Sequence, residues 1–344
     1  MLAIQDVVNE ETVVTDEKLE SSVNDQSFVD TSCDSFVQCE LLTSSTSKWH
    51  IDMFENNNKA ILYYTGLSNM EHFDFVFNFL GPAANELNVQ CHLLCPRDQL
   101  FLTLMKLRQA KEDYELALLF NISESLVHKL FVTWLNFMYF QFKEVDVWPS
   151  RKVVTQHMPS GFRDMFPNTR VILDATEIPI NKPSNVNAQC ETYSTYKNRN
   201  TLKTMIGITP NGSVSHISDC YGGSASDRQI IERSELMENG KFNKNDAIMA
   251  DRGIMVQDLF ALKDVHVNTP TMLKGKSQLS AETVIRDRRI SSKRIHVERQ
   301  IGNAKTYKIL TQPLPITKIN LGSKIVYVCF FLSNLRKSIV SKWA

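Results

Sequence analysis

Apolar residues recur every three to four positions in two stretches of the first half of the chain, the spacing of one helix face. The first stretch, residues 59–81, stops at Gly81-Pro82. The second, residues 98–142, divides into three helices, and Ser123 precedes the third as an N-cap. A short helix, a three-residue turn and a longer amphipathic helix predict a helix-turn-helix, although many helical bundles share this pattern.

From residue 171 onward, short runs rich in Val, Ile, Leu and Met replace the helical spacing and predict β-strands. Thr209-Pro210-Asn211-Gly212 is a hairpin turn between two of them. Ser226-Asp227 begins a helix that continues to Leu236. Strands followed by covering helices predict an α/β fold with a mixed sheet flanked by helices, preceded by a small all-α domain. The predicted strands are Val171–Ile178, Leu202–Ile208, Val214–Cys220, Asp246–Ala250 and, at an edge, Val265–Asn268.

The two ends of the chain carry opposite charge, although its formal net charge is zero. Residues 1–47 hold ten acids and one lysine (1 − 10 = −9), whereas residues 271–344 hold fifteen Lys and Arg and three acids (15 − 3 = +12). The acidic segment lacks apolar periodicity, which predicts a disordered leader. The basic end suits phosphate backbones. The predicted organisation is a leader at 1–47, a helical region at 48–145 with the helix-turn-helix at about 98–142, a linker at 146–168 and an α/β domain at 169–340.

Three acids are candidates for a cation site. Asp174 and Asp251 end or lie within apolar runs typical of buried strands, where an acid is costly unless it is paired or bound to metal. Glu298 lies in the stretch Arg294–Gly302, a predicted basic helix. Each acid also has a simpler explanation, because an Asp at a strand end often caps a turn and Glu298 can pair with Arg294 four residues earlier. Carboxylates that converge from different elements are, however, the ligands that Mg²⁺ takes.

Seven motifs in this order resemble the DDE-superfamily endonuclease domain of PIF/Harbinger transposases and the genes derived from them, over residues from about Leu62 to Leu335. The resemblance implies a ribonuclease H-like fold and a catalytic triad of Asp174, Asp251 and Glu298. It also implies two Mg²⁺ or Mn²⁺ ions, cleavage of DNA phosphodiester bonds, and a nuclear protein with a cytoplasmic pool. The motifs are Asp174–Pro179, Tyr193–Lys197, Lys203–Gly212, Tyr221–Asp227, Met249–Gly253, Gly275–Leu279 and Arg294–Gly302.

Three residues near the triad have roles that the sequence leaves open. Asp227 is an accessory acid by the resemblance, whereas its place at a helix start favours capping. Gly302, one turn beyond Glu298, either leaves room for the DNA backbone or allows a close helix–strand contact. Glu177 is expected on the opposite face of its strand from Asp174, outside the site.

DNA contacts are expected on both predicted domains. His128 and Lys129 are the cations on the exposed face of the third helix, where Glu124 opposes them. A solvated helix face in the basic end is expected to supply most of the affinity for phosphate. Its residues are Arg288, Arg289, Lys293 and Arg294.

The seven scattered cysteines are typical of a reducing compartment, and no apolar run of membrane-spanning length is evident. The pair Cys91 and Cys95 has no second ligand pair at zinc-finger spacing. Many relatives carry an N-terminal THAP zinc finger, whose pattern Cys33 and Cys39 do not fit. Targeting is therefore expected to need a separate DNA-binding protein, and the oligomeric state stays open. The competing hypothesis is a domesticated, non-catalytic DNA-binding or interaction protein, while the basic end disfavours a phosphoesterase that does not act on DNA.

Overall fold

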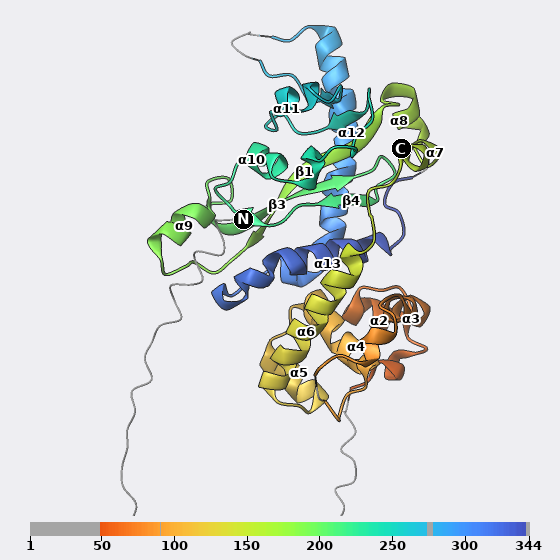
Figure 1. Cartoon of the computed structure of the whole chain (residues 1–344), viewed down its shortest axis with the longest axis vertical. Coiled ribbons are helices and arrows are strands. Elements are labelled where there is room, and N and C mark those ends of the chain that lie inside the picture. Colours follow the sequence, from red (N-terminus) through yellow and green to blue (C-terminus); the bar gives the residue numbers. More distant parts are fainter. Residues whose placement is uncertain (1–48, 90, 274–277, 342–344) are drawn as a thin grey trace, which may run out of the picture.

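The computed structural model describes residues 49–89, 91–273 and 278–341. Figure 1 shows a bundle of helices at one end of the protein, a twisted sheet with helices on its faces at the other, and α13 between them. The predicted fold class, an α/β domain with a mixed sheet preceded by a small helical domain, is confirmed. The predicted acidic leader, residues 1–47, lies outside the described residues.

The first predicted helix, residues 59–81, is two helices in the structure. α2 (Asn58–Thr65) ends at Gly66, whose φ of +81° lies in the left-handed region that favours glycine. α3 (Met70–Phe79) begins after Asn69, whose side chain caps it. The spacing of apolar residues did not reveal the break, because residues on both sides of Gly66 are buried in one core. Two 3₁₀ segments flank the pair, η1 (Ile51–Phe54) and η2 (Pro82–Asn85).

The three helices predicted between residues 98 and 142 are present. They are α4 (Pro96–Gln109), α5 (Asp113–Phe120) and α6 (Glu124–Lys143). Asn121 ends α5 with a φ of +54°, and the Ser123 hydroxyl accepts a hydrogen bond from the backbone N–H of Leu126 at 3.3 Å. The predicted N-cap is therefore confirmed, and so is the order of short helix, turn and longer helix.

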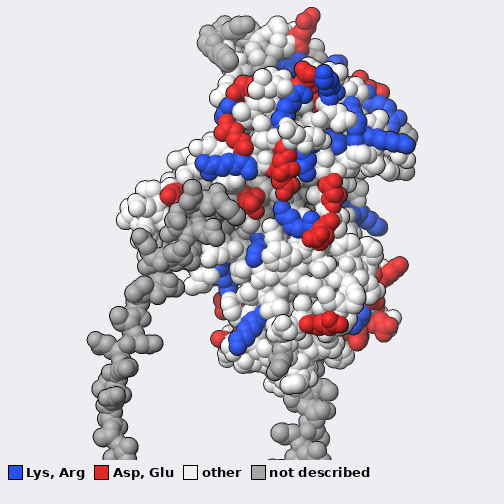
Figure 2. Space-filling model, in the orientation of Figure 1, with Lys and Arg blue, Asp and Glu red and all other residues white. Residues whose placement is uncertain are grey.

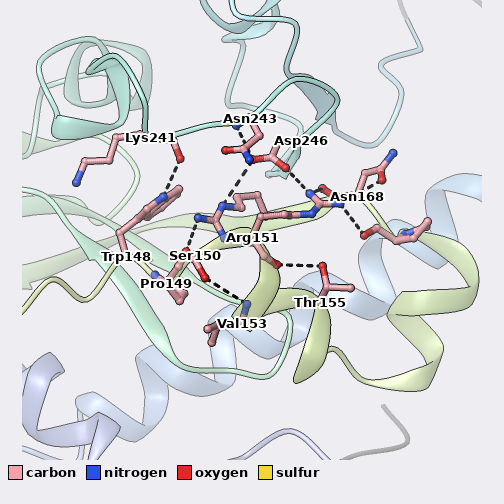
Figure 3. A network of polar contacts seen from close by, with 12 residues as sticks. Trp148, Pro149, Ser150, Arg151, Val153, Thr155, Asn168, Lys241, Asn243 and Asp246 are labelled. Atoms are coloured by element: carbon pink, nitrogen blue, oxygen red, sulfur yellow. Dashed lines mark hydrogen bonds and ion pairs between the residues drawn. The ribbon is translucent and has the colours of Figure 1, made fainter.

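The predicted linker at 146–168 is not an irregular connection. It contains α7 (Arg151–Gln156) and α8 (Ser160–Met165) and is fixed to the sheet domain. Figure 3 shows how Arg151 reaches Asp246, which lies just before strand β6. Trp148 donates a hydrogen bond to the carbonyl of Lys241 at 2.8 Å. Pro159 is the N-cap of α8 and Gly161 lies inside that helix, so residues that are typical of a linker belong to a short helix here.

The described strands form one seven-stranded sheet around β1. β1 pairs antiparallel with β3 and parallel with β6, and β6 pairs parallel with β7. Gly212, with a φ of +93°, closes the predicted hairpin between β3 and β4. The strands are β1 (Thr169–Pro179), β2 (Tyr193–Ser194), β3 (Arg199–Ile208), β4 (Val214–Ile217), β5 (Tyr221–Gly222), β6 (Ala247–Met249) and β7 (His266–Asn268).

Alternate residues of β1 enter two different hydrophobic clusters, because successive side chains of a strand point to opposite faces. Val171 and Leu173 pack with residues of α10 (Asp227–Glu232), η3 (Glu235–Met237) and α11 (Gln257–Ala261). Ile172 and Ile178 pack with the long C-terminal helices and with the N-terminal helices. These C-terminal elements are α12 (Ala281–Ala304), η4 (Lys308–Leu310), η5 (Ile316–Leu321) and α13 (Gly322–Asn334).

The two predicted domains therefore share a core. α13 lies against α6 (Figure 1), and the rings of Phe142 and Phe331 stack with centroids 4.1 Å apart. Lys318 also forms an ion pair with Asp113 at 3.1 Å. The sequence suggested two units joined by a linker, but it could not show that the last helix returns to cover the first domain.

Residues Ile316–Asn334 form the one helical stretch, among the described residues, that is by itself long and apolar enough to cross a membrane. Most of it is buried inside the protein. α5 and α6 meet the same criterion only as a pair bent by 103°. Core helices of globular proteins commonly have this composition.

Replacing Asp246 should destabilise the fold by about 3 kcal/mol, the cost of removing one partner from a buried ion pair. Asp246 is 1% exposed and pairs with Arg151 and, at 3.6 Å, with Arg170, which is itself 4% exposed. The change Asp246→Asn keeps the side-chain shape but leaves both guanidinium groups without their counter-charge. The measurement is the free energy of unfolding in urea.

The matched control is Asp264→Asn, whose carboxylate is 63% exposed and pairs with Lys244 at 3.6 Å. It should change the free energy of unfolding by less than about 1 kcal/mol. Equal effects of the two substitutions would show that the buried pair does not stabilise this junction.

Candidate active site

The register of the two central strands brings Asp174 and Asp251 together. Ile172 of β1 faces Met249 of the parallel strand β6. Asp174 lies two residues after Ile172, and Asp251 lies two residues after Met249. Because the two strands are parallel, both acids lie at the same end of their paired region. β6 ends at Met249, and Asp251 begins a turn in which its carbonyl accepts a hydrogen bond from the N–H of Ile254 at 3.0 Å.

Helix α12 supplies the third acid. Val297 and Ile301 anchor this part of α12 in the core on the face of β1 that carries Asp174. Glu298 is next to Val297 and remains exposed at the edge of that contact. Arg294 lies one helical turn before Glu298, so the two side chains share a face.

The guanidinium of Arg294 lies among the three carboxylates. One of its terminal nitrogens, Nη1, is 2.8 Å from Oδ1 of Asp251. The other, Nη2, is 3.6 Å from Oδ1 of Asp174 and 3.9 Å from Oε1 of Glu298. The Arg294 side chain is only 10% exposed, and its Nε is buried without a hydrogen-bond partner. Three acids from three separate elements thus converge on a single cation.

The three acids differ in burial. The pKa of Asp174 is raised to about 6, because burial and the carboxylates of Glu298 and Asp251 raise it more than Arg294 lowers it. Side-chain exposure is 22% for Asp174, 51% for Asp251 and 57% for Glu298. The expectation of two buried strand acids is therefore correct for Asp174 and wrong for Asp251, because β6 ends before it.

The three carboxylates are of a kind that binds divalent cations, but they are arranged around the guanidinium of Arg294. Carboxylate oxygens are hard ligands of the kind that Mg²⁺ takes. Over residues 49–89, 91–273 and 278–341, no three His, Cys, Asp or Glu side chains form a group that could hold a metal ion as they stand. A metal ion bound by these acids would have to replace the guanidinium as their counter-charge.

The structure excludes one of the two roles that the sequence left open for Asp227, and one of the two for Gly302. Ser226, not Asp227, caps α10, while Asp227 pairs with Lys203 at 2.7 Å, so the capping role favoured for Asp227 is wrong. Gly302 has no atom within 4 Å of the position of an added Cβ, which excludes the close helix–strand contact.

Glu177 lies on the opposite face of β1 from Asp174, as predicted. Its side chain accepts a hydrogen bond from the hydroxyl of Thr201 on the neighbouring strand β3 at 2.8 Å. Alternation along β1 places residues 174 and 177 on different faces of the sheet.

The predicted DNA-binding residues of α12 divide into two pairs. Arg288 and Arg289 are exposed, as expected. Lys293 and Arg294 are each 8% exposed, so the prediction that they lie on a solvated face is wrong. Lys293 lies over the ring of Phe162, with its Nζ 5.2 Å from the centroid. A helix that packs against both the sheet and α8 has a wider buried face than its sequence suggested.

In the helix-turn-helix, His128 and Lys129 are exposed near the start of α6. The Nδ1 of His128 lies 3.8 Å from Oδ2 of Asp113, which begins α5. The Sγ of Cys95 donates a hydrogen bond to Asp98 at 3.1 Å, and neither Cys91 nor Cys95 belongs to a potential metal-binding group among the described residues.

Two family matches fall on these two regions. Residues 91–144, which contain α4, α5 and α6, match the helix-turn-helix of DDE superfamily endonuclease. Residues 173–334, from β1 to the end of α13, match the DDE superfamily endonuclease family. The chain belongs to the DDE superfamily endonucleases, a family of transposase origin. No curated protein matches the chain. The assignment of this endonuclease to the PIF/Harbinger group stays a prediction.

The contact of Arg294 with all three acids was not predicted from the sequence. Its spacing of four residues from Glu298 indicated one of the three ion pairs. The other two depend on how α12 crosses β1 and β6, which local spacing does not encode. For Lys203, the pairing with Asp227 had no sequence signal, because the two residues are far apart in the chain.

In protein kept in EDTA, Arg294→Gln should lower the free energy of unfolding by about 2 kcal/mol. The substitution leaves the mostly buried Asp174 beside two other carboxylates without a counter-charge. The expected loss is below the range of about 3–5 kcal/mol for fully buried pairs, because Asp251 and Glu298 are half exposed. Added Mn²⁺ should then raise the melting temperature of the variant more than that of the wild type, since it supplies a replacement cation.

Arg299→Gln is the control, because it removes an exposed positive charge from the same helix. It should change neither the stability nor the response to Mn²⁺ appreciably. An Arg294→Gln protein as stable as the wild type in EDTA would mean that the three ion pairs contribute nothing to folding.

Proposed function

We propose that this endonuclease-family protein is an active, metal-dependent DNA endonuclease that uses Asp174, Asp251 and Glu298. The observation that supports it is the convergence of these three carboxylates, from β1, the turn after β6 and α12, on one cation. Folding alone gives no reason to place three acids in one spot. Phosphodiester cleavage does, because its metal ions need carboxylates that converge from different elements.

Each side chain has a distinct part in the proposed site. Asp174, the most buried of the three acids, would hold both of the proposed divalent ions, with Mg²⁺ or Mn²⁺ as the candidates. Asp251 and Glu298 would each hold one ion from the exposed side. A bound divalent ion supplies an activated water and stabilises the leaving oxygen of a phosphodiester. Arg294, once released by the carboxylates, can donate two parallel N–H groups to a phosphate.

Asp227 remains an accessory candidate, through its ion pair with Lys203. Lys203 lies on the strand next to β1, opposite Glu177 in the register. The carboxylate of Asp227 also helps to raise the pKa of Asp174, although it has the smallest influence of the four charges around it. We assign it an electrostatic influence on the site and no metal ligation.

DNA is the proposed partner of both regions. The exposed Arg288 and Arg289 of α12 would contact phosphates, and His128 and Lys129 of α6 would approach the bases. Figure 2 shows Lys and Arg side chains interspersed with Asp and Glu over the sheet end of the molecule, whereas the helical end carries fewer charged side chains in this view. Because the recognition helix carries so few cations, the proposal includes a separate DNA-targeting protein. A location in the nucleus is also part of the proposal.

A non-catalytic, domesticated protein is the second candidate. It is favoured by the position of Arg294, which already neutralises part of the charge that a metal ion would neutralise. In that case the acids and the arginine form a purely structural network. The two candidates differ in whether the purified chain cleaves DNA.

Nicking of supercoiled plasmid in Mn²⁺ should separate them. We expect cleavage by the wild type and a loss of roughly 10²-fold or more for Asp174→Asn, since even indirect partners of metal ligands are worth 10–100-fold. Glu177→Gln, on the opposite face of β1, should keep activity within about twofold. A wild-type protein that binds DNA but cleaves none with Mg²⁺ or Mn²⁺ would favour the non-catalytic candidate.

For binding to duplex DNA, the slope of log affinity against log salt concentration should become less negative by about 2 in the double variant Arg288→Gln, Arg289→Gln. Each lost phosphate contact reduces the magnitude of this slope by about 0.9. Replacing His128 and Lys129 by Gln should alter sequence preference more than this slope. The measurement is a salt titration of binding by fluorescence anisotropy. An unchanged slope in the arginine variant would move the phosphate-binding surface away from α12.

A further inference from the structure

The motif Tyr193–Lys197 has no role in the proposed cleavage chemistry. It forms β2 and the turn into β3, in which Tyr193 pairs with Asn200 and Ser194 with Arg199. The backbone N–H of Lys197 donates a hydrogen bond to the Ser194 hydroxyl at 3.2 Å, and Asn198 completes the turn with a φ of +53°. We call residues 193–199 the tyrosine turn.

The tyrosine turn displays aromatic rings to solvent. The side chain of Tyr196 is 81% exposed, and that of Tyr193 is 42% exposed. The Nζ of Lys197 lies 4.5 Å from the centroid of the Tyr196 ring, so an exposed ring and an exposed cation are held together. Such a ring contributes little to the core, and the face that Lys197 does not cover can stack on another flat group.

A cavity of about 740 Å³ adjoins the turn. It lies between the turn, helix α9 (Val186–Thr192) and the segment that follows β1. This volume is within the range of roughly 300–1,000 Å³ that encloses small organic ligands. Its walls include Lys182, Gln189, Tyr193, Asn198, Arg199 and Asn200.

The surroundings of the cavity are positively charged on balance. Lys182, Lys197 and Arg199 are exposed, and Lys305 is half-buried nearby, with its Nζ bonded to the carbonyl of Glu177 at 3.1 Å. The pKa of Lys305 is lowered first by burial and then by the charge of Lys197. The opposing acids are Glu177, engaged by Thr201, and the exposed Glu191.

The amides that line the cavity are already engaged. The side-chain N–H groups of Asn200 bond to the carbonyl of Gln189 and the hydroxyl of Thr192, at 2.9 and 2.8 Å. That of Gln189 bonds to the carbonyl of Pro183 at 2.8 Å. A ligand here would be held by ring stacking and by charge more than by reading of hydrogen-bond patterns, which is how proteins bind single-stranded nucleic acid.

Strand β3 connects this cavity to the acids. Arg199 begins β3, and Ile206, seven residues later, pairs with Asp174 of β1. At about 3.3 Å per residue the separation is roughly 23 Å.

We propose that the tyrosine turn and the adjoining cavity bind an unpaired nucleotide of the DNA, at a site separated from the acids by roughly 23 Å of strand β3. Tyr196 stacks on the base, while Lys182 and Arg199 contact the flanking phosphates. This assignment rests on the proposed function as a DNA endonuclease, but the binding itself requires no catalysis.

The test measures binding of a fluorescein-labelled 12-nucleotide oligothymidylate, and of a duplex of the same length, to the full chain in EDTA. Tyr196→Ala should weaken binding of the single strand by about 10-fold, the typical effect of losing one stacked base, and should alter duplex binding less than twofold. Tyr196→Phe, which keeps the ring, should restore single-strand binding. Tyr193→Ala tests the second ring in the same way.

Tyr63→Ala is the matched control, because Tyr63 is 55% exposed on α2, in the other part of the molecule. It should leave both affinities unchanged. Single-strand binding that is unaffected in both Tyr196→Ala and Tyr193→Ala would overturn the proposal, as would an equal loss for duplex, which would indicate contacts to phosphates only. If plasmid nicking fails but Tyr196 is needed for the oligonucleotide, the cavity assignment stands and the catalytic proposal falls.

Discussion

The burial of strand β1 on both faces is the constraint on which this structure depends. Its side chains alternate between two hydrophobic clusters, so a polar residue in it is tolerated only with a partner. Asp174 lies within that strand, and the pKa of its carboxyl group is raised to about 6, chiefly by burial and against the opposing effect of Arg294. Arg294 from α12 supplies the partner, and the same guanidinium gathers Asp251 and Glu298. The cation that compensates the charge of Asp174 is thus shared with two further acids from other elements.

Much of the fold follows from local pattern. The helices at 98–142, the cap at Ser123, the hairpin at Gly212 and the strands around Asp174 were predictable, because each depends on residues that are neighbours in the chain. The break at Gly66 and the helices inside the expected linker were not predicted. Short helices leave too few turns for a periodic pattern to be distinguished from irregular chain.

The candidate site shows the same division. The three acids were identified by their motifs, and their convergence on Arg294 is a finding of the structure. The burial of Lys293 and Arg294 could not be predicted, because a basic helix that packs on two sides has the same composition as one that is solvated. Charge along a sequence reports how many cations are available, whereas the packing of α12 decides which of them reach the solvent.

The stack of Phe142 on Phe331 joins the end of the recognition helix to the last helix of the endonuclease domain. This contact belongs to a continuous core, which the helix-turn-helix shares with α12, the helix that carries Glu298. Under the proposed function, this packing would fix the offset between the DNA that α6 contacts and the phosphodiester bond at Asp174. A DNA that contacted both α6 and the acids would have to match that offset, so its deformability would contribute to the selection of a site.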